Sequence, residues 1–188
     1  SNSFYGRGGT PTSAAYAEAA AYLLGTTTGG GIYSGISKRK TFNGTAVISG
    51  YENIIVENDD TYKTPLTAST ASCSGQGIYF LTDGQPQSPK ATNTDVLMAN
   101  ALGLDSYTEV SDFDADGSND KGDHKSDWPL IGAFAKSLND VSKIQDASGL
   151  NLSTGILTAV VGLGTSLAGK DATYAQSWGG ANYGGGGF

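Results

Sequence analysis

The densest group of ligand-type side chains lies at residues 112–123, which read DFDADGSNDKGD. Carboxylates stand at the first, third, fifth, ninth and twelfth positions, with glycine at the sixth, and this is the spacing of a calcium-binding loop. In such a loop alternate side chains converge on one ion, and glycine permits the sharp turn. The predicted ligands are five carboxylates and one backbone carbonyl: Asp112, Asp114, Asp116, Asp120, Asp123 and the carbonyl of Ser118. The sequence therefore predicts a Ca²⁺ site.

The alternative interpretation of this loop is a solvated acidic segment. The usual twelfth residue is Glu, which binds through both oxygens, so Asp123 is a weaker match. Five carboxylates within twelve residues nevertheless repel one another unless a cation lies between them. We therefore favour calcium, and expect the ion to order an acidic insertion at residues 103–126.

A second candidate ligand, Asp83, follows the apolar run 78–81 in the stretch GIYFLTDGQP. In an open α/β sheet, ligands bind in the crevice beyond the carboxyl ends of the strands. A Thr-Asp pair at that place offers oxygen atoms to a hard cation such as Mg²⁺ or Ca²⁺. Because Asp-Gly is also a common turn, this stretch alone leaves a simple turn open.

Helices and short apolar runs alternate along the chain and must position these residues. The patterns predict helices at 12–24, 95–102 and 127–138, and strands at 78–81 and 156–163. The two apolar runs are of the kind that is buried on both faces of a parallel sheet. The run 51–57, YENIIVE, fits a short strand or a helical turn, and its periodicity leaves both open. The alternation indicates an α/β fold with a mostly parallel sheet flanked by helices.

Length and charge limit the classes of protein. A chain of 188 residues suits one domain, residues 1–188, with a long glycine-rich insertion at 25–72. Eleven basic and eighteen acidic residues give a net charge of −7, which disfavours nucleic acid and anionic membranes as partners. No apolar run approaches the roughly 20 residues of a transmembrane helix. The single Cys73 is either a buried thiol or the partner of a cysteine elsewhere.

Four sequence blocks occur in a characteristic order: GGTPTSAAYAEAAAYL (8–23), CSGQGIYFLTDGQP (73–86), LTAVVGLG (157–164) and WGGANYGGGGF (178–188). Together they resemble the successive signature blocks of a von Willebrand factor A-type (vWA) domain. The cysteine before LTDG, the upstream YKTPL and the late glycine-rich loop most resemble the variant found in PilY/PilC-type proteins. That family comprises the tip adhesins and assembly factors of type IV pili in Gram-negative bacteria.

The resemblance implies a Rossmann-like fold and a metal-ion-dependent adhesion site built from three loops. By matching residues, Thr10 of GGTPT would supply its threonine and Asp83 of LTDG its aspartate, with Mg²⁺ or Ca²⁺ as the ion. The Asp-x-Ser-x-Ser motif of the first loop does not occur in these residues. We therefore expect a vWA-like fold that lacks its first strand or strands, with long loop insertions and an incomplete adhesion site.

The function that the resemblance implies is extracellular adhesion at a type IV pilus tip, with support of pilus assembly. The implied partners are pilin or minor pilin subunits, a host or surface ligand, and the remainder of the protein's own polypeptide. One alternative is a purely structural pilus-priming domain stabilised by calcium. Another is a metal-assisted hydrolase. We do not expect an enzyme, because His124 is the only histidine and the chain has no phosphate-binding loop and no nucleophile-elbow motif.

Overall fold

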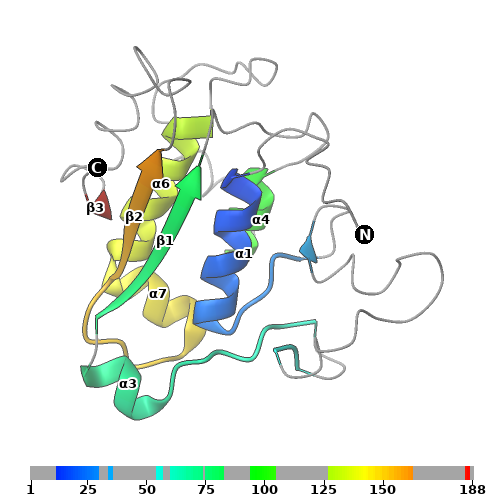
Figure 1. Cartoon of the computed structure of the whole chain (residues 1–188). Coiled ribbons are helices and arrows are strands. Elements are labelled where there is room, and N and C mark those ends of the chain that lie inside the picture. Colours follow the sequence, from blue (N-terminus) through cyan, green and yellow to red (C-terminus); the bar gives the residue numbers. More distant parts are fainter. Residues whose placement is uncertain are drawn as a thin grey trace, which may run out of the picture.

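The protein is described here by a computed structural model, which covers residues 12–29, 34–35, 54–56, 60–73, 75–82, 94–104, 127–162 and 185–186. In these ranges it is a mixed α/β structure with a small parallel sheet flanked by helices (Figure 1). The elements in chain order are α1 (Thr12–Leu24), α3 (Ala68–Cys73), β1 (Gln76–Thr82), α4 (Thr94–Ala101), α6 (Asp127–Asn139), α7 (Val141–Ser148), β2 (Ile156–Gly162) and β3 (Gly185–Gly186).

The sheet has the strand order β1-β2-β3, and both pairings are parallel. In the β1–β2 pair, Gln76 lies opposite Ile156 and Thr82 lies opposite Gly162, so the two strands match along their full length. Parallel neighbours need a crossover connection, and the chain between β1 and β2 contains α4, α6 and α7. The predicted α/β class with parallel strands is confirmed at this level.

The predicted helices and strands lie close to where the sequence patterns put them. Helix α1 coincides with the predicted range 12–24, and α4, α6, β1 and β2 agree with their predicted ranges to within two residues. For segment 51–57 the sequence left a short strand and a helical turn as alternatives. Its residue Ile55 forms an isolated antiparallel bridge with Tyr62. Of the last eleven residues, predicted to be irregular, Gly185 and Gly186 form β3 beside β2. That prediction was wrong for these two residues, because pairing with β2 supplies a strand geometry that glycine alone does not favour.

Helix α7 carries clear capping signals but was not predicted. Asp140 is its N-cap and accepts hydrogen bonds from the Ser142 backbone N–H at 3.0 Å and from the Ser142 hydroxyl at 2.6 Å. The Ser142 hydroxyl bond is the main reason why the pKa of Asp140 is lowered. At the other end Gly149 adopts a left-handed conformation, with φ 65°, which glycine allows without steric cost. The short helix buries Ile144, and Val141 and Ala147 lie at helical spacing from it, so an apolar stripe was present in the sequence.

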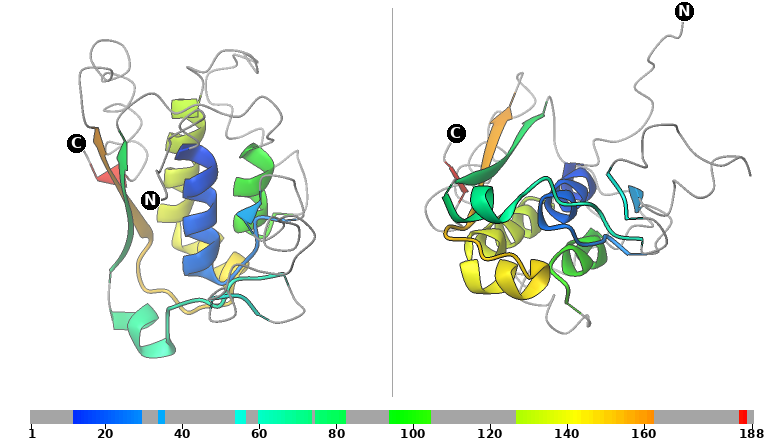
Figure 2. Two further views of the ribbon diagram at one scale, coloured as in Figure 1. Left: turned by 45° about the vertical axis from the view of Figure 1, so that its right-hand side comes forward. Right: turned by 90° about the horizontal axis from the view of Figure 1, so that it is seen from below.

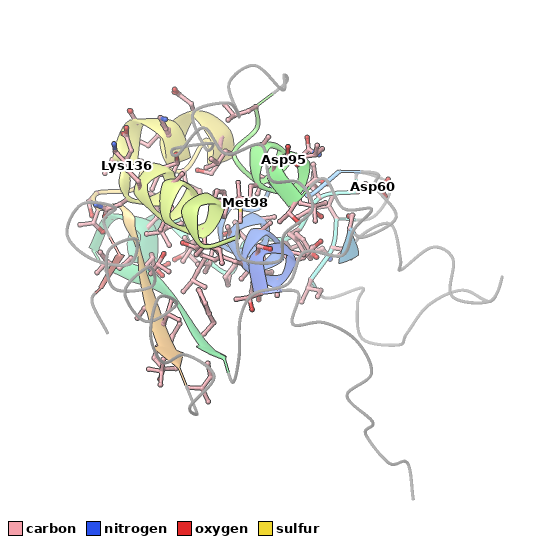
Figure 3. All side chains as sticks on the ribbon, turned by 90° about the horizontal axis from the view of Figure 1, so that it is seen from above. Asp60, Asp95, Met98 and Lys136 are labelled. Carbon is pink, nitrogen blue, oxygen red and sulfur yellow. The ribbon has the colours of Figure 1, made fainter. Side chains whose placement is uncertain are left out.

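The core lies between the sheet and the helices. Alanines 17, 20 and 21 of α1 are fully buried, and their small side chains permit close approach of the neighbouring α4. Met98 of α4 is also fully buried, and Figure 3 shows it turned towards the interior while Lys136 lies on the outside of α6. Among the helices that the structure describes, none combines the length and the apolarity needed to cross a membrane.

The expectation that β1 and β2 are buried on both faces was wrong. Their inner face packs against α1 and α6 and buries Ile78, Ile156 and Val160. On the opposite face Tyr79 is 63% exposed and Leu81 56% exposed. Figure 2 shows α1, α4, α6 and α7 on one side of the two strands. Runs of apolar residues predict strands, but they do not reveal whether helices cover one face or both.

Candidate functional site

Two parallel strands and two helices place their ends together at one end of the molecule. The arrowheads of β1 and β2 lie there, and so do the first residues of α1 and of α6 (Figure 1). We call this end the carboxyl edge, because β1 ends there at Thr82 and β2 at Gly162. In open α/β sheets this edge is where ligands bind. Helix N-termini that meet there add exposed N–H groups and a partial positive charge.

Tyr16 fixes the height of α1 against the sheet. Its ring lies 5.4 Å from that of Phe80 in β1, centroid to centroid, and its hydroxyl is hydrogen-bonded to Oγ1 of Thr158 in β2. Thr12 lies four residues before Tyr16 in α1, a distance of about 6 Å along the helix axis towards the carboxyl edge. Thr82 lies two residues after Phe80 in β1, a distance of about 7 Å along the strand in the same direction. The first residue of α1 and the last residue of β1 therefore stand at similar height at the carboxyl edge.

Every metal ligand predicted from the sequence lies outside the described residues, so its side-chain geometry is not defined. Thr10 precedes the first residue of α1 by two positions, and Asp83 directly follows the last residue of β1. The predicted calcium loop, with Asp112, Asp114, Asp116, Ser118, Asp120 and Asp123, belongs to the segment between α4 and α6. Its last ligand is four positions before Asp127, where α6 begins. The described elements therefore adjoin the segments that carry these predicted ligands.

The described residues by themselves hold no metal centre. Within the ranges given above, no three His, Cys, Asp or Glu side chains gather closely enough to bind an ion.

The hydrogen bond between Tyr16 and Thr158 belongs to the core beneath the edge. Tyr16 is 1% exposed and Thr158 is 3% exposed. Burial raises the pKa of the Tyr16 phenol far above its ordinary value, against a smaller lowering effect of the Thr158 hydroxyl. The phenol therefore stays protonated at any physiological pH. It acts as a structural hydrogen-bonding group and not as an acid or base.

Glu18 is a polar centre that the sequence reasoning did not single out. Its Oε1 accepts hydrogen bonds from the Thr28 hydroxyl at 2.8 Å and from the Gly35 N–H at 2.6 Å, and its Oε2 accepts one from the Tyr62 hydroxyl. The Thr28 hydroxyl also bonds that of Ser34 at 2.8 Å. These bonds fasten two loop segments to α1.

A signal for this centre was present in the sequence. Glu18 is the only charged residue in the alanine-rich helix TSAAYAEAAAYLL. A lone acid in such a helix needs partners when it is partly covered. Because the Glu18 carboxylate accepts hydrogen bonds from three donors, it has a structural role, and we assign it no catalytic or binding function.

The tight turn before β2 depends on Gly155. A Cβ atom at this position would lie 2.2 Å from the backbone carbonyl oxygen of Asn139, the last residue of α6. Glycine therefore allows the chain to pass directly under the end of α6 as it enters β2. This contact sets the position of β2, and with it the position of the carboxyl edge.

No protein-family model matches the chain, and neither the curated proteins nor the solved structures contain a significant match. The evidence for function therefore lies in the sequence blocks and in the geometry of the described residues.

Proposed function

We propose that the chain is a vWA-like, metal-dependent binding module whose ion lies at the carboxyl edge. The observation that carries the proposal is the level of α1 against β1, fixed by the contacts of Tyr16 with Phe80 and Thr158. It supports neighbouring positions for the start of α1, which Thr10 precedes by two residues, and for the end of β1, which Asp83 directly follows. A hydroxyl and a carboxylate are suitable ligands for a hard cation.

In this proposal Thr10 and Asp83 hold the ion by two oxygens and leave further positions open. Mg²⁺ prefers six oxygen ligands in octahedral geometry and usually keeps several waters. An acidic group on a partner protein could replace one of these waters and so be bound through the ion. Binding would then need the metal, which is the behaviour of an adhesion module and requires no catalytic residue.

The biological setting in the proposal comes from the resemblance to PilY/PilC-type proteins. It places the domain outside the cell at a type IV pilus tip, where it supports pilus assembly and attachment. Pilin or minor pilin subunits, a host or surface ligand, and other parts of the same polypeptide are the proposed partners. The net charge of −7 is consistent with a cation between the domain and an acidic group, because direct contact would be repulsive.

Isothermal titration with Mg²⁺ and with Mn²⁺ tests the ion site. We expect Asp83→Ala to abolish a binding event that the unmodified chain shows, because the substitution removes the only carboxylate assigned to the site. Asp146→Ala is the matched control, since Asp146 is an exposed acid on α7, and it should leave the titration unchanged. Equal binding by the Asp83→Ala variant would refute the assignment. Pilin capture that resists chelation would refute metal-dependent binding.

A second role, structural stabilisation by calcium, is favoured by the five carboxylates of residues 112–123. Ligand binding to the folded state alone stabilises it by about 2.7 kcal/mol at a concentration 100 times Kd. For a chain of this size that corresponds to a rise in Tm of roughly 5–11 °C. We expect Ca²⁺ to raise Tm in this way and the double variant Asp114→Ala, Asp116→Ala to lose the rise. Thermal unfolding with Ca²⁺ and with chelator measures it.

The control for the calcium loop is again Asp146→Ala, which should keep the full calcium effect. The Asp83→Ala variant should keep it too, because its carboxylate is assigned to the other site. If Ca²⁺ does not change the Tm of the unmodified chain, residues 112–123 are a solvated acidic loop.

A further inference from the structure

Two stretches of the predicted insertion converge on one carboxylate of α1. Oε1 of Glu18 accepts hydrogen bonds from the Thr28 hydroxyl at 2.8 Å and from the Gly35 N–H at 2.6 Å. Oε2 accepts one from the Tyr62 hydroxyl. Gly35 is 17 positions from Glu18 in the sequence, whereas Tyr62 is 44 positions away. One side chain of α1 therefore connects to two stretches that are distant from each other along the chain.

The first stretch begins with a base that is fixed to α4. The Thr26 hydroxyl donates to the carbonyl of Ala101 at 2.7 Å. The Asn100 amide donates to the carbonyl of Thr28 at 3.0 Å. Gly29 follows this base with φ 82°, a conformation that glycine adopts without steric cost. Because these bonds to α4 do not pass through the carboxylate of α1, we expect the base to keep its place when that carboxylate is removed.

The second stretch is a short hairpin with its own backbone pairing. The Val56 N–H donates to the carbonyl of Thr61 at 2.9 Å. The Lys63 N–H donates to the carbonyl of Ile54 at 2.7 Å. Such bonds hold the two sides of an antiparallel pair in register. The hairpin is therefore expected to move as one piece.

Tyr62 attaches the hairpin to α1 and to the base of the first stretch. Its N–H donates to the carbonyl of Thr26 at 2.8 Å. Its ring meets that of Tyr22 edge to face, with centroids 6.0 Å apart. Its hydroxyl donates to Glu18. Of these contacts the last has a charged acceptor, which makes it stronger than a hydrogen bond between neutral groups.

The two stretches are attached mainly by polar contacts. Ile55 and Tyr62, 2% and 7% exposed, are the buried apolar side chains in the described part of both stretches. Segments with few buried apolar contacts are those that open locally while the rest of a protein stays folded. The hydrogen bonds to Glu18 therefore have a large share in holding the two stretches against α1.

From these contacts we propose that the two stretches open and close over α1 as one unit, which we call the strap, and that Glu18 is the latch that holds it closed. The strap consists of residues 34–35, 54–56 and 60–63. The physical reason is that both stretches use the same carboxylate, so a rotation of the Glu18 side chain that releases Tyr62 also moves the acceptor of Gly35. No strap residue is an assigned metal ligand, so the strap and the metal site can fail separately.

Amide hydrogen exchange, measured by NMR on the full chain, tests the latch because it reports local opening residue by residue. In the unmodified chain the strap amides should exchange faster than the Thr26 amide of the base, which donates to Ala21 at 2.9 Å. We expect Glu18→Ala, a substitution that suits a helix, to speed exchange in the strap about tenfold or more, since hydrogen bonds to a charged group change an equilibrium by that factor. The strap amides to follow are those of Gly35, Val56, Tyr62 and Lys63. Exchange at Thr26 should not change.

The decisive variant is Tyr62→Phe, which removes the hydroxyl and keeps the ring beside Tyr22. Gly35 keeps its own acceptor in this variant, so exchange at Gly35 would be unaffected if the two stretches opened separately. With one strap, we expect exchange at Gly35 to rise about tenfold, as in the hairpin. The double variant Glu18→Ala, Tyr62→Phe should exchange no faster than Glu18→Ala alone, because both substitutions remove the same contact.

Asp146→Ala on α7 is the control and should leave exchange in the strap unchanged. An unchanged Gly35 amide in Tyr62→Phe would mean that the stretches open separately, and would overturn the proposal. Equal acceleration of the Thr26 amide in Glu18→Ala would overturn it too, since Glu18 would then stabilise the whole domain. Strap amides that exchange at the rate of Thr26 in the unmodified chain would mean that the strap opens only when the protein unfolds, which also contradicts the latch.

Discussion

Replacing Phe134 with alanine is expected to reduce the free energy of unfolding by about 3–5 kcal/mol. The ring is completely buried and meets Tyr16 edge to face, with centroids 5.0 Å apart and planes at 80°. Tyr16 in turn packs on Phe80, so the three aromatic rings connect α6, α1 and β1. The substitution would leave a cavity where these elements meet and remove an aromatic pair worth about 0.5–1.5 kcal/mol beyond its area.

Thermal and denaturant unfolding measure this effect, and for a chain of this length the Tm should fall by roughly 6–20 °C. Lys136→Ala is the matched control, because Lys136 lies on the same helix with an exposed side chain (Figure 3). Its Tm should change little. If the two variants were equally stable, α6 would not be packed on α1 as described.

Replacing Gly155 with alanine is expected to destabilise the protein by about 1–3 kcal/mol, as overpacking typically does. The new Cβ would lie 2.2 Å from the carbonyl oxygen and 2.6 Å from the carbonyl carbon of Asn139. Both are backbone atoms at the end of α6, so rotation of a flexible side chain cannot relieve the contact. The end of α6 and the start of β2 must move apart, which disturbs the packing of β2 against α6.

Gly75→Ala is the control for this substitution. Gly75 stands immediately before β1 as Gly155 stands before β2, but a Cβ there would have no atom within 4 Å. Because alanine restricts the unfolded chain, this variant should be unchanged or more stable by about 0.4–1 kcal/mol. Urea unfolding of both variants gives the comparison. A Gly155→Ala variant as stable as Gly75→Ala would contradict the close passage of the chain beneath α6.

The local patterns of the sequence predicted most of the regular elements. Alanine-rich spacing gave α1 with its bounds, and compact apolar runs gave β1 and β2, because helix and strand periods are recorded in the order of residues. Helix α7 was missed although Val141, Ile144 and Ala147 stand at helical spacing and Asp140 and Gly149 are suitable caps. The short strand β3 was missed because two glycines carry no strand signal and depend on pairing with β2.

The candidate metal ligands Thr10 and Asp83, and the calcium loop at 112–123, come from the sequence alone. Spacing is sufficient to suggest them, because ligand loops are continuous stretches whose oxygens alternate in a fixed pattern. They remain predictions, since their side chains lie outside the described residues. For Thr10 and Asp83, what the structure adds is the similar level of the adjoining elements, the start of α1 and the end of β1.

The sequence by itself determined the α/β class and most of the helices and strands that make it, and it predicts the residues that would bind a cation. Only the tertiary structure decided which face of each strand is covered, since both faces of β1 and β2 carry large apolar residues and the covered face even includes the polar Thr158. It also decided that Glu18 fastens distant loops and that Gly155 passes beneath Asn139. These features depend on contacts between residues far apart in the chain, and no local pattern of residues records which distant groups will meet.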